Sequence, residues 1–407
     1  MTAPLPVVGT VPDSSLADPE VAPGSLIHAI NDDPDALVYF LVNVGDGDTQ
    51  LLLLPPDTGD PTGARHLVIV DVATPSKLPK LLDALHAAQV NGQPLIDVPG
   101  SERQIRLLVA THPHFDHIGG MTDLITRYGN LNPSVTPCIE MFWEPGYFYP
   151  TPSFHNLMAT LESTPRIRRL QPTSGTTMTI DSVRLTALGP GIGLRNRFDT
   201  YGVEINDSSI TLMVEFPANA LFAEDSDHGL DRRAAPTASR RLLLGGDAQF
   251  TSWAQATVDF PDLVQEQNSV LAEELRAARG RDYLAADLIK ISHHASKHGV
   301  NLELMERVGA PIALVSSVAG GGKYGFPHLL AMEAAREARQ ATTTKSTPRK
   351  TDQELGIHVT GSKLDTGKPA GSIAVVISKA SGRALRLFRF GDTPSGAIDL
   401  AAAREVK

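Results

Sequence analysis

Cysteine is nearly absent from the sequence, which has only Cys138 among its 407 residues. A single cysteine excludes a framework of disulfides within the chain and any zinc site built from several thiolates. The composition is therefore typical of a protein that works in a reducing compartment. We expect Cys138 to be a small buried hydrophobic residue rather than a nucleophile.

Long apolar runs are absent as well. No segment approaches the ~18 to 20 consecutive apolar residues that a membrane helix needs. The N-terminus also lacks the charged-then-apolar pattern of an export signal. The sequence therefore predicts a cytoplasmic protein with no membrane partner.

Basic residues are not in excess, because 36 Lys and Arg face 46 Asp and Glu and the formal net charge is -10. A surface that grips nucleic acid as a whole needs clustered positive charge, so a nucleic-acid partner would have to meet a local basic patch. Local groups of arginines could supply one, although each group is equally typical of a solvated surface. These groups contain Arg166, Arg168, Arg169, Arg195, Arg197, Arg232, Arg233, Arg240 and Arg241.

Hydrophobic residues make up 42% of the chain, which suffices for a sizeable core. Residues 1–25 are rich in Pro, Ser and Asp without a sustained period, and this predicts a flexible N-terminal segment. We expect one main domain over residues 26–395, with polar insertions at 223–240 and 340–356. A C-terminal tail is expected at 396–407.

Short apolar runs alternate with helical patterns along this domain. The runs predicted as strands are ALVYFLVNVG, QLLLLP, HLVIVD, QIRLLVATH, SSITLMVEF, RRLLLGGD, DLIKISHH, PIALVSSV and SIAVVIS. The segments predicted as helices are SKLPKLLDALHAAQ, MTDLITRYG, HNLMATLE, SVLAEELRAARG and LLAMEAAREARQ. Because several strands are apolar on both faces, the pattern indicates sheets covered by helices in a layered α/β domain.

Polar side chains stand where four of these strands end. Asp71 closes HLVIVD, His112 closes QIRLLVATH, Asp247 closes RRLLLGGD, and His293 and His294 close DLIKISHH. If the carboxyl ends of these strands lie together, the polar residues meet at one sheet edge, where α/β proteins commonly bind ligands.

The segment THPHFDHIGG, residues 111–120, carries the densest set of possible metal ligands. Imidazoles and carboxylates suit zinc and similar divalent ions. In an extended chain His112 and His114 point the same way and can hold one ion. Asp116 and His117 follow in the turn before a glycine pair and can face a neighbouring ion. The spacing indicates two metals.

The remaining strand ends complete this hypothesis. Asp247 could bridge both ions, and one histidine of the His293–His294 pair could complete the second site. Asp71 is expected to accept a hydrogen bond from a metal-bound imidazole, since such rings normally donate their other N–H to an acceptor. A third nitrogen ligand of the first ion could come from His155 or, less favoured, from His228.

The H-x-H-x-D-H segment resembles the signature of the metallo-β-lactamase superfamily. More narrowly, the chain resembles the soluble hydrolase domain of the bacterial competence protein ComEC and its stand-alone relatives. The segments that carry this resemblance are VNVGDGDTQLLLL, VDVATP, EINDSSITLMVEF, LLLGGDA, LIKISHHAS and SSVAGGGKYGFPH. Two positions depart from the family pattern, because Ala295 replaces a glycine and His328 follows Pro327 instead of preceding it.

The resemblance implies an αββα sandwich with a dinuclear site at one edge. In that reading, His112 and His114 bind one ion and Asp247 bridges the pair. Asp116, His117 and His294 bind the other ion. The expected cofactors are two divalent ions, Zn²⁺ in the first place and Mn²⁺ as the alternative.

Hydrolysis is the expected reaction. Asp116 and Asp247 would orient the nucleophile, whereas His293, with Lys290 or Lys323, would stabilise anionic oxygens or protonate the leaving group. The first hypothesis is a phosphodiesterase or nuclease with an anionic substrate. The second is a hydrolase of a small ester, lactone or phosphocholine-like molecule, and the third is a degenerate domain that only binds.

Overall fold

The computed structural model describes most of the chain. The described residues are 25–56, 65–90, 93–97, 102–130, 132, 134–197, 204–218, 223–225, 229–231, 239–260, 282–318, 324–340, 350–361, 371–380, 382–392 and 396–406. The predicted flexible segment 1–25, apart from Ser25, lies outside them, as do His228, Lys323 and the predicted helix SVLAEELRAARG.

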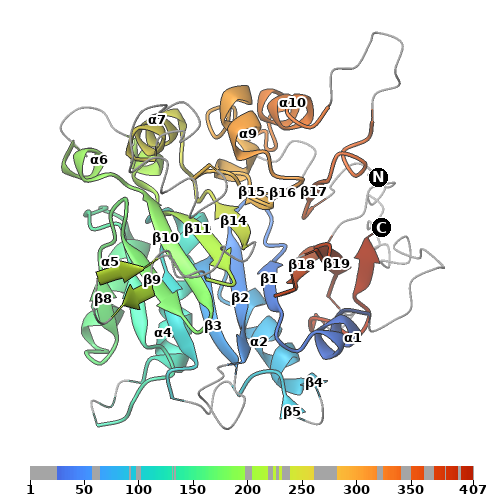
Figure 1. Cartoon of the computed structure of the whole chain (residues 1–407). Coiled ribbons are helices and arrows are strands. Elements are labelled where there is room, and N and C mark those ends of the chain that lie inside the picture. Colours follow the sequence, from blue (N-terminus) through green and yellow to red (C-terminus); the bar gives the residue numbers. More distant parts are fainter. Residues whose placement is uncertain are drawn as a thin grey trace, which may run out of the picture.

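Two large sheets form the centre of the described structure (Figure 1). The nine-stranded sheet has the order β20-β19-β18-β1-β2-β3-β6-β7-β8. Its strands are β1 (Leu37–Leu41), β2 (Thr49–Pro56), β3 (Arg65–Val72), β6 (Ile105–Val109), β7 (Met141–Trp143), β8 (Arg168–Leu170), β18 (Ser372–Ile377), β19 (Arg386–Phe390) and β20 (Arg404–Val406).

The seven-stranded sheet has the order β17-β16-β15-β14-β11-β10-β9. Its strands are β9 (Thr177–Ile180), β10 (Val183–Gly189), β11 (Thr211–Phe216), β14 (Arg240–Leu244), β15 (Leu288–Lys290), β16 (Ile312–Val315) and β17 (Ile357–Val359). Two short hairpins, β4 (Gln89–Val90) with β5 (Gln93–Pro94) and β12 (Ala223–Asp225) with β13 (Gly229–Asp231), lie outside these sheets.

Helices cover the outer face of each sheet. The nine-stranded sheet packs against α1 (Ser25–Asp32), α2 (Lys77–Ala87), α4 (Met121–Tyr128) and α5 (Pro152–Glu162). The seven-stranded sheet packs against α7 (Phe250–Asp259), α9 (Leu302–Val308) and α10 (Leu329–Glu337). The molecule is therefore the αββα sandwich that the sequence predicts. Short helices α3 (Phe115–Ile118), α6 (Ile192–Arg197), η2 (Ile205–Ser208) and η3 (His293–Ala295) lie at strand ends or in connections.

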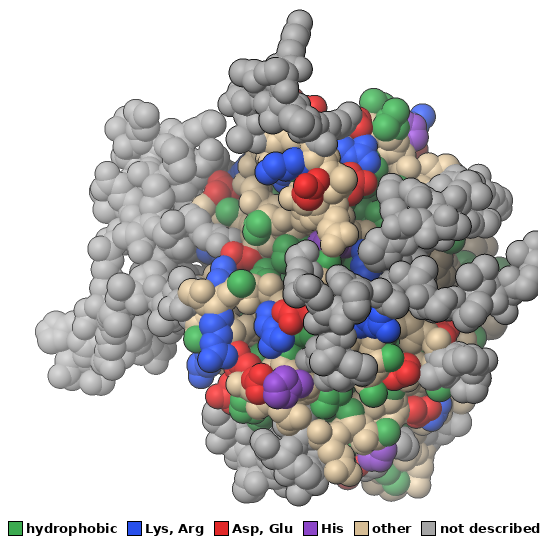
Figure 2. All heavy atoms as spheres, turned by 90° about the vertical axis from the view of Figure 1, so that its right-hand side faces the viewer, with side chains coloured by type: hydrophobic (Ala, Val, Ile, Leu, Met, Phe, Trp, Pro, Cys, Tyr) green, Lys and Arg blue, Asp and Glu red, His purple; other side chains and the backbone are tan. Residues whose placement is uncertain are grey.

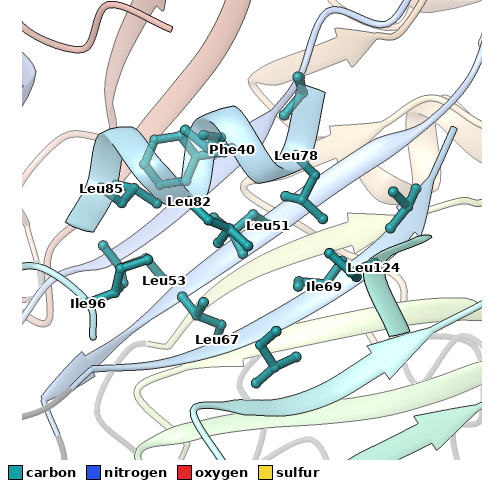
Figure 3. Close-up of a cluster of buried hydrophobic side chains, with 14 of the residues drawn as sticks. Phe40, Leu51, Leu53, Leu67, Ile69, Leu78, Leu82, Leu85, Ile96 and Leu124 are labelled. Atoms are coloured by element: carbon teal, nitrogen blue, oxygen red, sulfur yellow. The ribbon is translucent and has the colours of Figure 1, made fainter. Parts of the chain in front are cut away.

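Burial on both faces explains why many strands read as continuous apolar runs. In β1, Leu37, Tyr39 and Leu41 point into the core between the sheets, whereas Val38 and Phe40 point into the core beneath the helices. Figure 3 shows the helix side, where α2 lies across strand residues. Its labelled residues are Phe40, Leu51, Leu53, Leu67, Ile69, Leu78, Leu82, Leu85, Ile96 and Leu124.

The C-terminal segment differs from the predicted tail. Residues 404–406 form β20, which pairs with β19 at the edge of the nine-stranded sheet, and Leu400 and Ala403 are buried in the core on the helix side. The reason is that burial of these two side chains recruits the segment to an otherwise open sheet edge. None of the described helices is both long and apolar enough to cross a membrane.

Strand direction brings the predicted polar residues to one edge. β3 runs parallel to β6 in the first sheet, and β14 runs parallel to β15 in the second. Their carboxyl ends lead into the segments that contain Asp71, His112, Asp247 and His294. Interactions between Asp247 and the histidines of both sheets show that these four ends meet.

Candidate metal centre

Asp71 fixes the proton positions of two imidazoles. Its carboxylate accepts hydrogen bonds from His117 Nδ1 at 2.7 Å, from the Thr111 backbone N–H at 2.8 Å and from the Thr111 hydroxyl at 2.7 Å. Because the hydroxyl proton is used on Asp71, Thr111 Oγ1 can only accept from His112 Nδ1, which lies 3.1 Å away. The Nε2 atoms of His112 and His117 are therefore left with lone pairs.

His294 is oriented in the same way from the second sheet. Its Nδ1 donates to the Ser316 carbonyl at 2.9 Å, so its Nε2 also carries a lone pair. That Nε2 lies 3.6 Å from Asp116 Oδ2 and 3.7 Å from Asp247 Oδ1. The ring itself is fully buried.

These lone pairs converge on Asp247. Its Oδ1 lies 3.2 Å from His117 Nε2, and its Oδ2 lies 3.7 Å from His112 Nε2. His117 Nε2, His294 Nε2 and Asp247 Oδ1 are buried, and no group in the part of the chain that the structure describes hydrogen-bonds them. Lone pairs that face a carboxylate repel it unless a proton or a cation lies between them.

A divalent ion fits this arrangement. Two ligands that are each ~2.1 Å from a tetrahedral zinc ion lie roughly 3.4 Å apart. The four separations given above, from 3.2 to 3.7 Å, bracket that value. Among the described residues, the groups of donors within 4.8 Å of one another include His112 with His117 and Asp247, and Asp116 with His117 and His294.

The donor group of Asp48, Asp71 and His117 is not a third metal site. Asp71 already receives three hydrogen bonds, as described above, and the Asp48 carboxylate is bound by the ammonium group of Lys290. Lys290 and Gln50 both bind Asp48 Oδ2, so this oxygen and the Asp71 carboxylate are used by protons of the chain.

The pKa shifts of His117 and Asp247 also show that positive charge stabilises this cluster. Burial lowers the pKa of His117, but the Asp247 and Asp71 carboxylates outweigh this effect and raise it well above 6.5. Burial raises the pKa of Asp247, but His117 and His294 outweigh it and hold the pKa well below its usual range. In the absence of a cation, a proton takes its place between these groups.

His114 and Asn206 lie at one end of the cluster. His114 Nδ1 is 3.0 Å from His112 Nε2, and burial lowers the pKa of His114. The Asn206 side chain, from η2, lies with its Nδ2 3.5 Å from His293 Nε2, and its buried Oδ1 has no hydrogen-bond partner among the described residues. Asn206 is thus a polar group at the centre that the sequence analysis did not single out.

His155 is not brought into the cluster. It is exposed on α5, where its ring contacts Phe148 and Phe154 with centroid distances of 5.3 and 6.5 Å. It belongs to none of the donor groups among the described residues. The helix directs it outward because Phe154, its neighbour, is the side chain that packs into the core. His228, the other candidate, lies outside the described residues.

Lys290 does not face the opening, which corrects the role expected for it. Its side chain is fully buried on β15, and its ammonium group pairs with Asp48, directly before β2 of the other sheet. Asp48 also lies 3.6 Å from His294 Nδ1. An ammonium held this far from solvent by a carboxylate cannot reach a substrate. It joins the two sheets beneath the centre instead.

His293 is the more open member of its pair. Its side chain is 18% exposed, its Nε2 lies 3.8 Å from Asp247 Oδ2, and its Nδ1 has no hydrogen-bond partner. The pair sits on an unusual backbone, since His293, His294 and Ala295 have φ of 50°, 51° and 60°. Left-handed conformations cost ~1 to 2 kcal/mol for each residue that is not glycine.

Hydrogen bonds hold this strained turn in place. The His293 N–H donates to the Gly246 carbonyl at 2.9 Å, and the His328 N–H donates to the Ala295 carbonyl at 2.8 Å. Gly246 itself has φ of 52° and a side chain there would press on the Ile210 carbonyl. Strain of this kind is commonly found at functional sites.

Comparison with known proteins finds one family model. Residues 62–192, about a third of the chain, match the model of the Metallo-beta-lactamase superfamily. The matched segment contains Asp71 and the whole of residues 111–120. No curated protein matches the chain significantly by sequence.

Several solved structures are similar to the chain. A mutant of CmlA beta-hydroxylase is 12% identical with a TM-score of 0.37, and the match covers 80% of this chain and 52% of that one. A diphosphatase from the PhnP family is 12% identical with a TM-score of 0.34, covering 84% and 99%. A long form RNase Z from yeast is 10% identical with a TM-score of 0.32, covering 70% and 38%. The chain thus spans about half of the first of these.

Proposed function

We propose that this protein is a hydrolase that holds two divalent metal ions at the shared edge of its sheets. The observation that carries the proposal is the set of three oriented imidazoles, His112, His117 and His294, whose Nε2 atoms face Asp247. Among the described residues, no proton donor of the chain satisfies the buried His117 Nε2, His294 Nε2 and Asp247 Oδ1 atoms. Divalent ions would satisfy them, and Zn²⁺ is the first choice for nitrogen and oxygen ligands.

Asp116 and His293 have different roles in this proposal. Divalent ions bound there would lower the pKa of water and neutralise charge on the reacting oxygens. Asp116, whose side chain is 38% exposed, can orient an attacking water molecule from the open side. His293, whose Nδ1 has no partner among the described residues, can hold a substrate oxygen.

Among hydrolysable bonds, a phosphodiester of a small molecule is our first proposal. Two divalent ions held at this centre would neutralise the charge of a phosphodiester without further cations. A carboxylic ester or lactone is the alternative, because it needs the same polarising centre and no recognition of negative charge.

The arginines that could form a basic patch favour a small substrate over a long nucleic acid. Arg168 binds Glu140, Arg240 lies 3.2 Å from Asp287, and Arg241 lies 3.2 Å from Glu215. A guanidinium that is already paired releases few counterions when a polyanion arrives. On the face in Figure 2, basic and acidic side chains of the described residues are likewise interspersed.

The test combines metal analysis with turnover. The purified full chain, loaded with zinc or manganese, should contain close to two ions per chain and cleave bis-p-nitrophenyl phosphate. Asp247→Asn should lose bound metal and reduce turnover by ~100-fold or more, because it removes the shared carboxylate. Asp83→Asn, an exposed carboxylate paired with Arg127, is the matched control and should keep both.

The same assay separates the alternatives. Cleavage of labelled DNA or RNA at rates above those for the small phosphodiester would replace our choice by a nuclease. Turnover of lactones alone would favour the ester hydrolase. A chain that binds no metal and cleaves none of these substrates would contradict the proposal as a whole.

A further inference from the structure

Aromatic rings lie at both ends of the row of imidazoles. The ring centroids of His114, His112, His117 and His294 follow one another at 4.7, 4.2 and 5.4 Å. Beyond His114 lies Tyr149, whose ring centroid is 5.6 Å away. Tyr149 therefore adjoins the His114 end of the row.

The other end carries a larger aromatic surface. The ring of Phe326 lies 5.4 Å from His293 and 5.7 Å from His294. Tyr324 stacks on Phe326 with a centroid distance of 5.8 Å and an interplanar angle of 27°. We call these two rings the Tyr324–Phe326 platform.

The platform is open to solvent where it adjoins the donors. Tyr324 is 59% exposed, and Phe326 is only half-buried although it touches the two histidines. Exposed aromatic side chains cost free energy in water unless a partner covers them, and stacked rings offer a flat surface to another ring. His293, the ring next to the platform, is also the donor with the partnerless Nδ1.

We propose that the Tyr324–Phe326 platform binds a planar ring of the substrate on the side of the scissile bond that is retained, so that the substrate is a compact aryl or heteroaryl phosphodiester. This inference rests on the proposed function and adds the substrate class to it. Stacking on the platform places the retained group beside His293 and leaves the opposite side of the bond free for the leaving group. Each ring that stacks on an aromatic side chain contributes enough to be measured.

Two pairs of compounds test whether the retained ring contributes to binding and turnover, because the leaving group does not change within a pair. Phenylphosphonate and methylphosphonate differ only by the ring, and their binding to the zinc-loaded full chain can be measured by calorimetry without turnover. Phenyl p-nitrophenyl phosphate and methyl p-nitrophenyl phosphate share one leaving group and one charge. We expect about tenfold tighter binding and about tenfold higher kcat/KM for the phenyl member, a difference of ~1.4 kcal/mol.

Variants assign this preference to the platform. Tyr324→Ala should reduce the phenyl-to-methyl ratio to about one third or less in both assays, and Tyr324→Leu, which keeps apolar surface without a ring, should restore only part of it. Phe250→Ala is the matched control, because Phe250 is 44% exposed and its ring contacts His298, outside the donor cluster. It should keep the ratio of the unmodified chain.

The outcomes separate this inference from the proposed function. Equal binding of the two phosphonates, binding of neither, or a ratio that survives in Tyr324→Ala overturns the ring proposal. If the loaded chain cleaves neither phosphate ester but still prefers phenylphosphonate and loses that preference in Tyr324→Ala, the platform stands and the proposed phosphodiester chemistry fails. If the chain cleaves both esters at equal rates, the proposed phosphodiester chemistry stands and the ring proposal fails.

Discussion

The two sheets contribute to the metal centre in different ways. The nine-stranded sheet supplies His112, His114, Asp116 and His117 from one short segment that joins β6 to α3 with an ordinary extended and helical backbone. The seven-stranded sheet supplies Asp247 and His294 from two separate strand ends, and His294 lies in a left-handed turn. We call residues 110–117 the relaxed half and the two strand ends of the second sheet the strained half. Asp71, which lies behind the relaxed half, has φ of 59° and does not belong to it. Strain of this kind persists only where the surrounding packing enforces it.

Among the residues behind the metal donors, Asp71 should have the largest effect on metal affinity. Asp71→Asn removes the acceptor that sets the ring protons of His117 and, through Thr111, of His112. We expect a loss of ~10- to 100-fold in metal affinity, because outer acceptors of metal-bound histidines have effects of this size. Competition with a chromogenic chelator measures it.

A similar pair elsewhere in the chain provides the control. His66 and Asp181 also form a carboxylate–imidazole pair, 3.0 Å apart, with no link to the centre. Asp181→Asn should leave metal affinity unchanged. Equal losses in Asp71→Asn and Asp181→Asn would show that the effect is general destabilisation and not orientation of the donors.

The ion pair between the two sheets should have the largest effect on stability. Lys290→Met leaves Asp48 buried without its cation, and we expect the free energy of unfolding to fall by ~3 to 5 kcal/mol. Urea unfolding measures this. The double variant with Asp48→Asn should recover a large part of the loss, since it removes the unpaired charge. A single variant within 1 kcal/mol of the unmodified chain, on the order of a surface pair, would refute this account.

The stability of the metal-free protein should depend on pH, because positive charge on the histidines stabilises the buried carboxylates. In the metal-free protein the carboxylates raise the pKa of His117 and of His294 above 6.5 despite burial. A raised pKa contributes stability that is complete below 6.5 and is lost as the pH rises through the folded value. Thermal unfolding with a chelator should therefore show stability falling by ~1 to 3 kcal/mol from pH 6.5 upward.

Added zinc should reverse this trend, because metal binding releases the ring protons and strengthens as the pH rises. Stability of the metal-free chain that increases above pH 6.5 would contradict the assigned directions of the pKa shifts. The histidines with lowered pKa values act below 6.5 and do not enter this window.

The smallest expected effect tests the strained turn. Ala295 has φ of 60° with a fully buried methyl group. Ala295→Gly relieves ~1 to 2 kcal/mol of backbone strain but loses ~0.8 kcal/mol of methyl burial and adds freedom to the unfolded chain. We expect a net change in unfolding free energy below ~1 kcal/mol. Ala110→Gly, at a buried position in the relaxed half without a positive φ, should destabilise more. The opposite order in denaturant unfolding would show that the left-handed turn is not strained.

The sequence predicts those parts of the fold in which burial on both faces makes a strand apolar throughout. All nine predicted strand runs contain or overlap a strand of the two sheets. The strands that it misses have other patterns. In β19, RLFRF, arginines alternate with apolar residues, and in β10, VRLTALG, polar residues interrupt the run. Alternation of this kind is typical of strands, but a search for continuous apolar runs does not detect it.

The metal centre, too, is only partly predictable from the sequence. A dense local motif identifies residues 111–120 from the sequence, and strand ends point to Asp71, Asp247 and His294. The partners of these groups could not be inferred, because they come from contacts across the sandwich. Thr111 passes the effect of Asp71 to His112, and Asp48 neutralises Lys290 over 242 positions of sequence. Only the folded chain brings such pairs together.

The division of the donors between the sheets also sets an order of events during synthesis. The ribosome releases His112, His114 and His117 long before Asp247 and His294, because the chain grows from its N-terminus. A nascent chain that ends before Asp247 thus offers three imidazoles without their central carboxylate and can hold an ion only loosely. Metal acquisition should accordingly be a late step of maturation, completed when the second layer closes over the first.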